Sequence, residues 1–118
     1  MTTRPTVFID GEAGTTGLEI HRRLAGRGDI EIVSLPADSR KDPEARRRAL
    51  NEVDLAILCL PDDASREAAA MAAGGRTRLL DASTAYRVDP DWVYGFAEMA
   101  PGHAARIAAA RRVSNHGC

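Results

Sequence analysis

Residues 7–20, VFIDGEAGTTGLEI, are typical of a buried strand that runs through a glycine-rich turn into a helix. A pyrophosphate approaches such a turn closely only where side chains are absent, and the first N–H groups of the following helix then point at the anion. The turn therefore predicts a cradle for the phosphates of a dinucleotide. Its candidate cofactor-binding residues are Gly11, Ala13, Gly14, Thr15, Thr16 and Gly17. The alternative is a tight turn with a close helix–sheet contact and no ligand, since such turns join strands to helices in many proteins.

The composition suits one domain without a membrane span. The chain has 118 residues, 44% of them apolar, and no apolar run approaches the roughly 20 residues that a membrane helix needs. A formal net charge of −1 argues against a nucleic-acid binder that relies on overall positive charge. Residues 1–6 lack the apolar segment of a signal peptide, and Cys59 and Cys118 do not suggest a disulfide framework. We therefore expect a protein of the reducing cytoplasm that binds neither nucleic acid nor membrane, and we predict no metal site.

Strands and helices alternate along the chain. After the strand at 7–10, the predicted elements are helices at 15–27, 43–51 and 63–73, strands at 31–35, 55–60 and 78–81, a helical stretch at 102–110 and a strand at 112–114. Apolar strands joined by helical crossovers imply a parallel sheet covered on both sides. We predict a Rossmann-like α/β fold, a doubly wound, mostly parallel sheet with helices on both faces. The basic run at 46–48 lies in the second helix, and we interpret it as a solvated face without a function.

The end of the second strand bears on the choice of cofactor. Dinucleotide folds selective for NAD place a carboxylate there to bind the ribose 2′-hydroxyl, whereas a 2′-phosphate needs donors or cations instead. This strand ends at Ser34, and Arg40 and Lys41 follow in the next loop. We therefore predict that Ser34 and Arg40 bind the 2′-phosphate of NADP, with Lys41 as a further candidate. An ordinary solvated loop is the alternative, and Asp38 in that loop favours it.

The turn after the third strand contains Cys59, Leu60 and Pro61. Ligands of doubly wound sheets lie beyond the carboxyl ends of the strands, so Leu60 and Pro61 are expected to face the ribose or nicotinamide of the cofactor. Cys59 is interpreted as a packed thiol. Asp62 and Asp63 are interpreted as the N-cap and a first-turn acid of the next helix, in preference to a catalytic role.

The loop after the fourth strand, residues 81–87, carries several hydroxyl groups and an arginine at the same edge of the sheet. Ser83, Tyr86 and Arg87 are the candidates for binding an anionic substrate or phosphate. Alternatively, Asp81 and Ser83 hydrogen-bond the backbone of the loop. The sequence leaves both interpretations open.

The sequence ends in SNHGC, residues 114–118, after the strand at 112–114. Cys118 stands where the next helix would begin, and a helix N-terminus lowers the pKa of a cysteine by favouring the thiolate. Cys118 is therefore the candidate nucleophile.

Three blocks of sequence resemble one family. FIDGEAGTTG at 8–17, LCLPDD at 58–63 and DASTAYR at 81–87 are similar to the N-terminal half of N-acetyl-gamma-glutamyl-phosphate reductases of the shorter form. The resemblance spans essentially all 118 residues. A more distant likeness is to aspartate-semialdehyde dehydrogenases, which share the type of cofactor loop and a nucleophilic cysteine.

The resemblance implies an enzyme of arginine biosynthesis. NADPH would reduce N-acetyl-glutamyl 5-phosphate to N-acetyl-glutamate 5-semialdehyde and phosphate, with Cys118 matching the nucleophile that forms a thioester. Ser83, Tyr86 and Arg87 fall in the loop that lies beside the family's site. Residues 1–118 would be the NADP-binding domain, and the family's substrate and dimerisation domain, with its acid/base histidine, has no counterpart here. By itself the chain is expected to be inactive, and with that domain it would form a homo-oligomer.

Two residues depart from the family pattern. His116 and Ala97 stand where the family usually has proline, and the loss of proline removes a constraint on the backbone that positions Cys118.

Two other functions stay open. One is a non-catalytic NADP-binding domain, and the other is a reductase of aspartyl phosphate.

Overall fold

The structure, a computed structural model, describes residues 4–11 and 14–115. In chain order its elements are β1 (Thr6–Asp10), α1 (Thr15–Ala25), β2 (Glu31–Val33), α2 (Pro43–Glu52), β3 (Leu55–Leu58), α3 (Asp62–Met71), β4 (Arg78–Asp81), β5 (Val93–Tyr94), the 3₁₀ turn η1 (Ala97–Met99), α4 (His103–Ala109) and β6 (Arg112–Ser114). Every predicted strand and helix is present, although β2 and β3 each end earlier than predicted. Within the described residues no helix is both long and apolar enough to cross a membrane.

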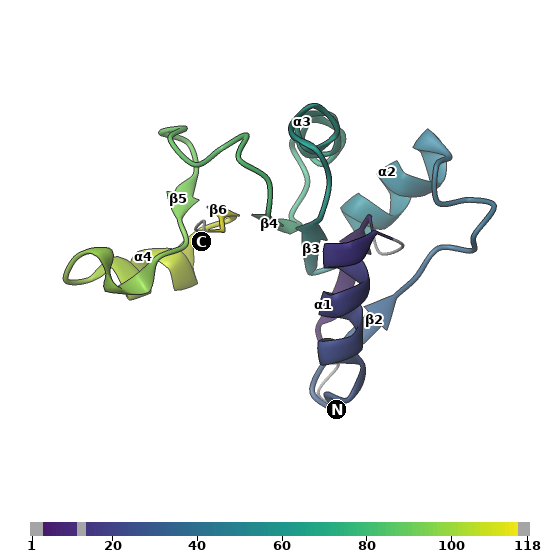
Figure 1. The fold of residues 1–118 in the computed structure, drawn as a ribbon, viewed down its shortest axis with the longest axis horizontal. Coiled ribbons are helices and arrows are strands. Elements are labelled where there is room, and N and C mark those ends of the chain that lie inside the picture. The colour runs from purple at the N-terminus through teal and green to yellow at the C-terminus, as the bar shows by residue number, and fades with distance from the viewer. Residues whose placement is uncertain (1–3, 12–13, 116–118) are drawn as a thin grey trace.

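The strands form one sheet in the order β2-β1-β3-β4-β6-β5, and every neighbouring pair is parallel. From β1 the chain winds through α1 to β2, then returns through α2 to β3 on the other side of β1. Figure 1 shows α2 and α3 on one side of the sheet and α1 and α4 on the other. This topology confirms the predicted doubly wound α/β fold. Its winding direction reverses between β1 and β3, which is where such sheets bind ligands.

The core follows the alternation of side chains along the strands. Phe8 of β1 points into a cluster beneath α2 and α3, whereas its neighbours Val7 and Ile9 point into a second cluster beneath α1. Ile20 and Leu24 of α1 pack against the second cluster, as their helical spacing predicts. Each face of β1 is therefore tied to a different helix layer, and this fixes the turn between β1 and α1.

Strand β5 was not predicted. Val93 pairs with Val113 and Tyr94 with Ser114 of β6, and Nε2 of the buried His103 donates a hydrogen bond to the carbonyl oxygen of Tyr94. A two-residue strand carries no periodic signal of its own, so only these contacts between distant parts of the chain define it.

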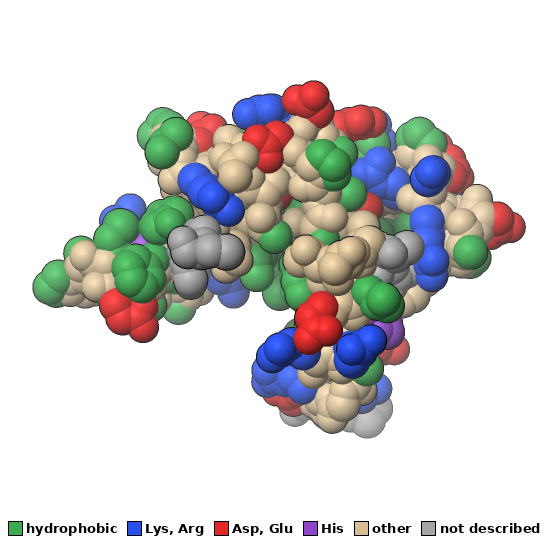
Figure 2. All heavy atoms as spheres, viewed as in Figure 1, with side chains coloured by type: hydrophobic (Ala, Val, Ile, Leu, Met, Phe, Trp, Pro, Cys, Tyr) green, Lys and Arg blue, Asp and Glu red, His purple; other side chains and the backbone are tan. Residues whose placement is uncertain are grey.

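The surface carries mixed charge. Figure 2 shows acidic and basic side chains side by side on the projection that α1 forms, where Glu19 pairs with Arg23 at 3.0 Å. Oppositely charged neighbours of this kind on an exposed helix contribute little to stability and create no broad field of one sign.

Candidate functional site

The glycine-rich turn begins at the carboxyl end of β1. Gly11 has φ of +89°, and a Cβ atom there would lie 2.4 Å from the carbonyl oxygen of Cys59, so both the backbone conformation and the close approach of the two turns require glycine. Gly14 is the N-cap residue of α1 and its N–H donates to the carbonyl oxygen of Gly11 at 3.0 Å. Because Gly14 has no side chain, it cannot cap the helix, and the first-turn N–H groups suit an anion.

The predicted residues of this turn are placed as follows. Thr15 and Thr16 are exposed on the first turn of α1, and Gly17 is buried. Ala13 lies outside the described residues. A glycine turn that approaches the turn after β3 this closely also fits the alternative interpretation, a structural contact without a ligand. The residues around the turn therefore have to distinguish the two interpretations.

A cavity of about 260 Å³ lies beside this turn, at the point where the sheet reverses its winding. It is lined by Phe8, Ile9, Asp10, Gly11, Gly14, Leu35, Arg40, Lys41, Arg46 and Leu60. Three predicted groups therefore meet: the glycine turn, the cations of the loop after β2, and the turn after β3. The cavity combines apolar walls with the cationic side chains of Arg40 and Lys41, a combination that suits a nucleotide.

Ser34 does not line this cavity. It is exposed at the end of β2 and lines a different hollow beneath α1, together with Arg4 and His21. Arg40 is brought next to the glycine turn because two turns shape its loop, with Ser39 N donating to Pro36 O at 2.9 Å and Asp42 N to Ser39 O at 3.1 Å. The structure thus brings Arg40 and Lys41 together at the cavity and leaves Ser34 apart from them.

The prediction that residues 46–48 form a solvated face is wrong for Arg46. The side chains of Arg46 and Asp10 are 13% and 5% exposed, and they form an ion pair with Nη2 donating to Oδ2 at 2.8 Å. Arg46 precedes the buried residues Ala49, Leu50 and Val53 by three, four and seven positions, so it lies on the same face of α2. That spacing is the signal in the sequence that could have revealed it. Arg47 and Arg48 are exposed, as predicted.

The turn after β3 touches the glycine turn. Cys59 N donates to the carbonyl oxygen of Asp10 at 2.9 Å, and its half-buried side chain packs against the cluster beneath α1. Burial, followed by the charges of Asp81 and Asp10, raises the pKa of the Cys59 thiol to about 11. Cys59 is therefore a packed thiol, as predicted, and it is protonated at neutral pH; it lies just after β3, whereas the predicted strand included it.

Asp62 differs from its predicted role. The N-cap of α3 is Pro61, and Asp62 and Asp63 both lie in the first turn of the helix. Asp62 instead accepts hydrogen bonds from the backbone N and the Oγ1 of Thr84, at 3.0 and 2.5 Å. The Thr84 hydroxyl is the main reason that the pKa of Asp62 lies below its ordinary value. This contact holds the loop after β4 against α3 and was not predictable from local sequence.

The loop after β4 begins with two buried polar residues. Ser83 Oγ donates to Oδ2 of Asp81 at 2.6 Å and accepts from Ala85 N at 3.1 Å, so Ser83 does hydrogen-bond the loop backbone as the alternative interpretation proposed. Three buried polar atoms at this edge have no partner among the described residues: Oδ1 of Asp81, Nε of Arg87 and Oγ of Ser114. Buried polar atoms are almost always hydrogen-bonded, so the partners of these three atoms lie outside the contacts that the structure describes.

Tyr86 is held by an aromatic stack. Its ring lies 4.1 Å from that of Trp92 at an angle of 8°, and the guanidinium of Arg112 lies 5.7 Å from the Trp92 ring. Burial, followed by the negative charge of Asp81, raises the pKa of the Tyr86 phenol. The stack fixes Tyr86 in the loop that also carries Ser83 and Arg87.

Cys118 and His116 lie outside the described residues. The last described residues of the chain lead toward the same edge, since Ser114 pairs with Asp81 in the sheet and Asn115 N donates to the carbonyl oxygen of Asp81 at 2.8 Å. Ala97 lies in η1.

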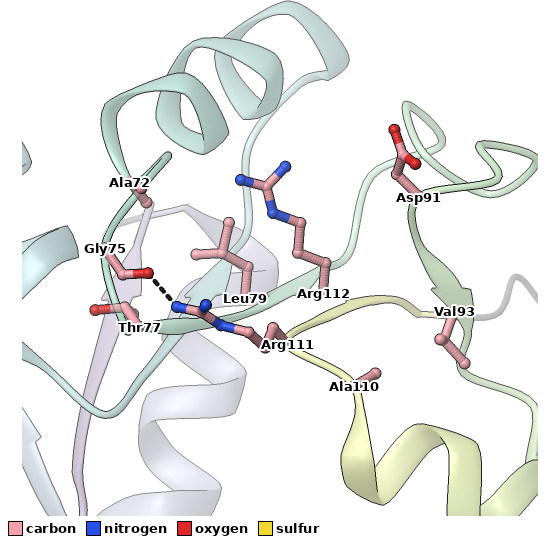
Figure 3. A pocket seen from close by; sticks show the side chains of 10 residues that line it. Ala72, Gly75, Thr77, Leu79, Asp91, Val93, Ala110, Arg111 and Arg112 are labelled. Atoms are coloured by element: carbon pink, nitrogen blue, oxygen red, sulfur yellow. Dashed lines mark hydrogen bonds between the residues drawn. The ribbon is translucent and has the colours of Figure 1, made fainter.

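A second cavity, of about 470 Å³, lies at the opposite edge of the sheet (Figure 3). Figure 3 shows Arg111 reaching to the carbonyl oxygen of Gly75, while Arg112 and Asp91 project on the same side. It adjoins the amino ends of β4, β5 and β6, whereas ligands of such sheets bind beyond the carboxyl ends. We therefore assign the site to the cavity at the glycine turn. Among residues 4–11 and 14–115 no group of three or more potential metal ligands gathers.

The chain is similar to known reductases. The chain is 59% identical over 115 residues to N-acetyl-gamma-glutamyl-phosphate reductase of Burkholderia lata, and 59% identical over 116 residues to that of Sinorhizobium fredii. Each match covers 98% of this chain, which spans 36% and 38% of those relatives. The resemblance stated from the sequence is confirmed.

Solved structures show the same fold. Aspartate semialdehyde dehydrogenase II of Vibrio cholerae superposes with a TM-score of 0.75 at 18% identity, over 98% of this chain and 42% of that one. The Francisella tularensis enzyme gives a TM-score of 0.72 at 16% identity, over 96% of this chain and 36% of that one. Residues 6–107 match the family model described as semialdehyde dehydrogenase, NAD binding domain. The chain therefore belongs to the semialdehyde dehydrogenase family and contains its NAD-binding domain.

Proposed function

We propose that residues 1–118 are the NADP-binding domain of a reductase that converts N-acetyl-glutamyl 5-phosphate to N-acetyl-glutamate 5-semialdehyde and phosphate, in arginine biosynthesis. The observation that carries the proposal is the cavity at the winding reversal, which joins the glycine turn to two cations. The relatives of this chain, named as reductases of this acyl phosphate, support the substrate.

The residues of the cavity fit a nicotinamide dinucleotide. Gly11 and Gly14 leave the turn bare of side chains, so the backbone N–H groups of the turn and of α1 would hold the pyrophosphate. Arg40 and Lys41 would hold the 2′-phosphate that distinguishes NADP from NAD. Ser34, just after β2, is retained as a proposed contact of the same phosphate, although it lines a different hollow. Leu60 and Pro61 would line the path toward the nicotinamide. When bound, the cofactor supplies a hydride.

The remaining chemistry belongs to the loop after β4 and to Cys118. The Cys118 thiolate would attack the carbonyl carbon of the acyl phosphate, the C–O bond to phosphate would break, and phosphate would leave, so that a thioester forms. Reduction of the thioester releases the semialdehyde and regenerates the thiolate. Ser83, Tyr86 and Arg87 would bind the anionic substrate or the departing phosphate. We further propose that the full-length enzyme is a cytoplasmic homo-oligomer.

The test is turnover of the full-length protein in the direction of acyl-phosphate formation, with N-acetyl-glutamate semialdehyde, phosphate and NADP⁺. We expect phosphate-dependent formation of NADPH and its loss in Cys118→Ser. Cys59→Ser, at the other cysteine of this chain, is the matched control and is expected to retain the activity. Aspartate semialdehyde is the competing substrate, favoured by the likeness to aspartate semialdehyde dehydrogenases. Turnover of that substrate alone, or NADP binding without any turnover, contradicts the proposal.

A further inference from the structure

The buried ion pair between Asp10 and Arg46 forms part of the wall of the cofactor cavity. Asp10 is the last residue of β1 and directly precedes Gly11. Arg46 reaches it from α2, with Nε 3.2 and 3.3 Å from the two carboxylate oxygens and Nη2 2.8 Å from Oδ2. Two of the three guanidinium nitrogens are thus committed to one carboxylate.

A carboxylate at this position is unfavourable for an anionic ligand. The turn that Asp10 opens is the one whose N–H groups suit a pyrophosphate, and a buried negative charge beside it repels that group through a medium of low dielectric constant. Arg46 offsets this charge. Among the described residues of the wall, the other charged side chains are those of Arg40 and Lys41.

We propose that Arg46 is a positioning residue of the dinucleotide site that acts through Asp10: it cancels the charge of Asp10 beside the glycine turn and so permits the pyrophosphate to bind. The inference rests on the proposed function, since it requires a dinucleotide in this cavity. It differs from the role of Arg40, because the pyrophosphate is common to NADP and NAD, whereas the 2′-phosphate is not.

Arg46→Gln tests the proposal in the full-length protein. Glutamine keeps a hydrogen-bond donor for Asp10 and removes the positive charge. We expect the dissociation constants of NADPH and NADH, measured by fluorescence titration, to rise by a similar factor of about ten or more. Arg48→Gln, on the exposed face of the same helix, is the matched control and is expected to change neither constant by more than about twofold.

The double variant Asp10→Asn/Arg46→Gln separates an indirect role from a direct one. Removing both charges restores a neutral pair, so NADPH affinity is expected to return to within about threefold of the unmodified protein. If the double variant binds as weakly as Arg46→Gln, Arg46 contacts the ligand itself and the proposal is overturned. Weakening of NADPH binding alone also overturns it, because Arg46 would then serve the 2′-phosphate.

Should Arg46→Gln not fold, Asp10→Asn provides the test, because it removes the repelling charge and leaves Arg46 in place. The proposal predicts NADPH binding at least as tight as in the unmodified protein, and weakening by more than about threefold overturns it.

Failure of the proposed function and failure of this inference give different results. If the unmodified protein binds neither dinucleotide, the proposed function and this inference both fail. If it binds NADPH and Arg46→Gln binds equally well, only this inference fails.

Discussion

The two halves of the sheet's carboxyl edge differ in how their buried charges are satisfied. At the ends of β1 and β3, Asp10 is paired with Arg46 and the two turns are in backbone contact. At the ends of β4 and β6, the Asp81 carboxylate accepts one hydrogen bond within the described part of the chain, from Ser83 to Oδ2, and its Oδ1 has no partner there. A buried polar group without a partner is unfavourable. The first half is therefore satisfied by contacts among the described residues, whereas the second half leaves buried polar atoms without a partner among them.

The largest effect is expected for Gly11→Ala in the first half. The new Cβ would meet the Cys59 carbonyl at 2.4 Å in a left-handed backbone conformation, so we expect the free energy of unfolding to fall by about 3 kcal/mol or more, measured by urea denaturation. Gly95→Ala is the counterpart in the second half. Its Cβ would lie 3.0 Å from the Ser114 carbonyl without a positive φ, and a loss of about 1 kcal/mol is expected. Equal losses of unfolding free energy in the two variants would show that the turns after β1 and β3 tolerate a Cβ atom no worse than the second half of the edge does.

The two aspartates provide the next comparison. Asp10→Asn leaves the largely buried Arg46 cation without its ion-pair partner and is expected to lower the free energy of unfolding by about 2 to 3 kcal/mol. Asp81→Asn removes a buried charge whose carboxylate has a single hydrogen-bond partner among the described residues, Ser83, so a change of less than about 1 kcal/mol, or a small gain, is expected. Urea denaturation at neutral pH measures both. A large loss in Asp81→Asn would mean that the second half is as self-contained as the first.

Cys59 lies between the two halves of the carboxyl edge. The pKa of its thiol depends on one charge from each half, Asp10 and Asp81. Because its pKa is raised to about 11, Cys59 holds very little thiolate at neutral pH. Its rate of alkylation by iodoacetamide, followed by peptide mass spectrometry, is expected to rise about tenfold for each pH unit between pH 8 and 10. Asp81→Asn removes one cause of the shift, so labelling at a given pH should be faster. A rate that levels off below pH 9 would contradict the raised pKa.

The smallest effect is expected at the exposed contact between Asp62 and Thr84. Thr84→Val removes the hydroxyl that chiefly lowers the pKa of Asp62. A lowered pKa means that the contact stabilises the fold above the ordinary value of 3.8 and that this contribution disappears as the pH falls through the lowered value. The difference in urea midpoint between Thr84→Val and the unmodified protein should therefore be small at pH 7 and vanish in acid. A difference that persists in acid would have another cause.

Much of the fold could be predicted from local patterns. The apolar runs and helical spacings predicted nine of the elements, and the glycine turn placed the candidate site at the end of the first strand. Gly11, Gly14, Arg40 and Leu60 do meet at one cavity. Such features are local because periodicity and turn chemistry act within a few residues of the chain.

What could not be predicted depends on contacts between distant residues. The ion pair joins positions 10 and 46, Asp62 binds a loop 22 residues away, and β5 exists only by pairing with β6. Ser34 and Arg40 are near in sequence, yet the chain turns between them and they line different hollows. None of these contacts leaves a periodic signal, apart from the place of Arg46 on the buried face of α2.

The sequence by itself determined the doubly wound fold, the glycine turn and the family resemblance, because each rests on short-range patterns of apolar residues and glycine. Only the tertiary structure decided that Arg46 is buried against Asp10, that Asp62 ties the loop after β4 to α3, and that the two halves of the carboxyl edge differ in how their charges are paired. The physical reason is that the energy of a buried charge depends on which groups the fold brings within a few ångströms of it.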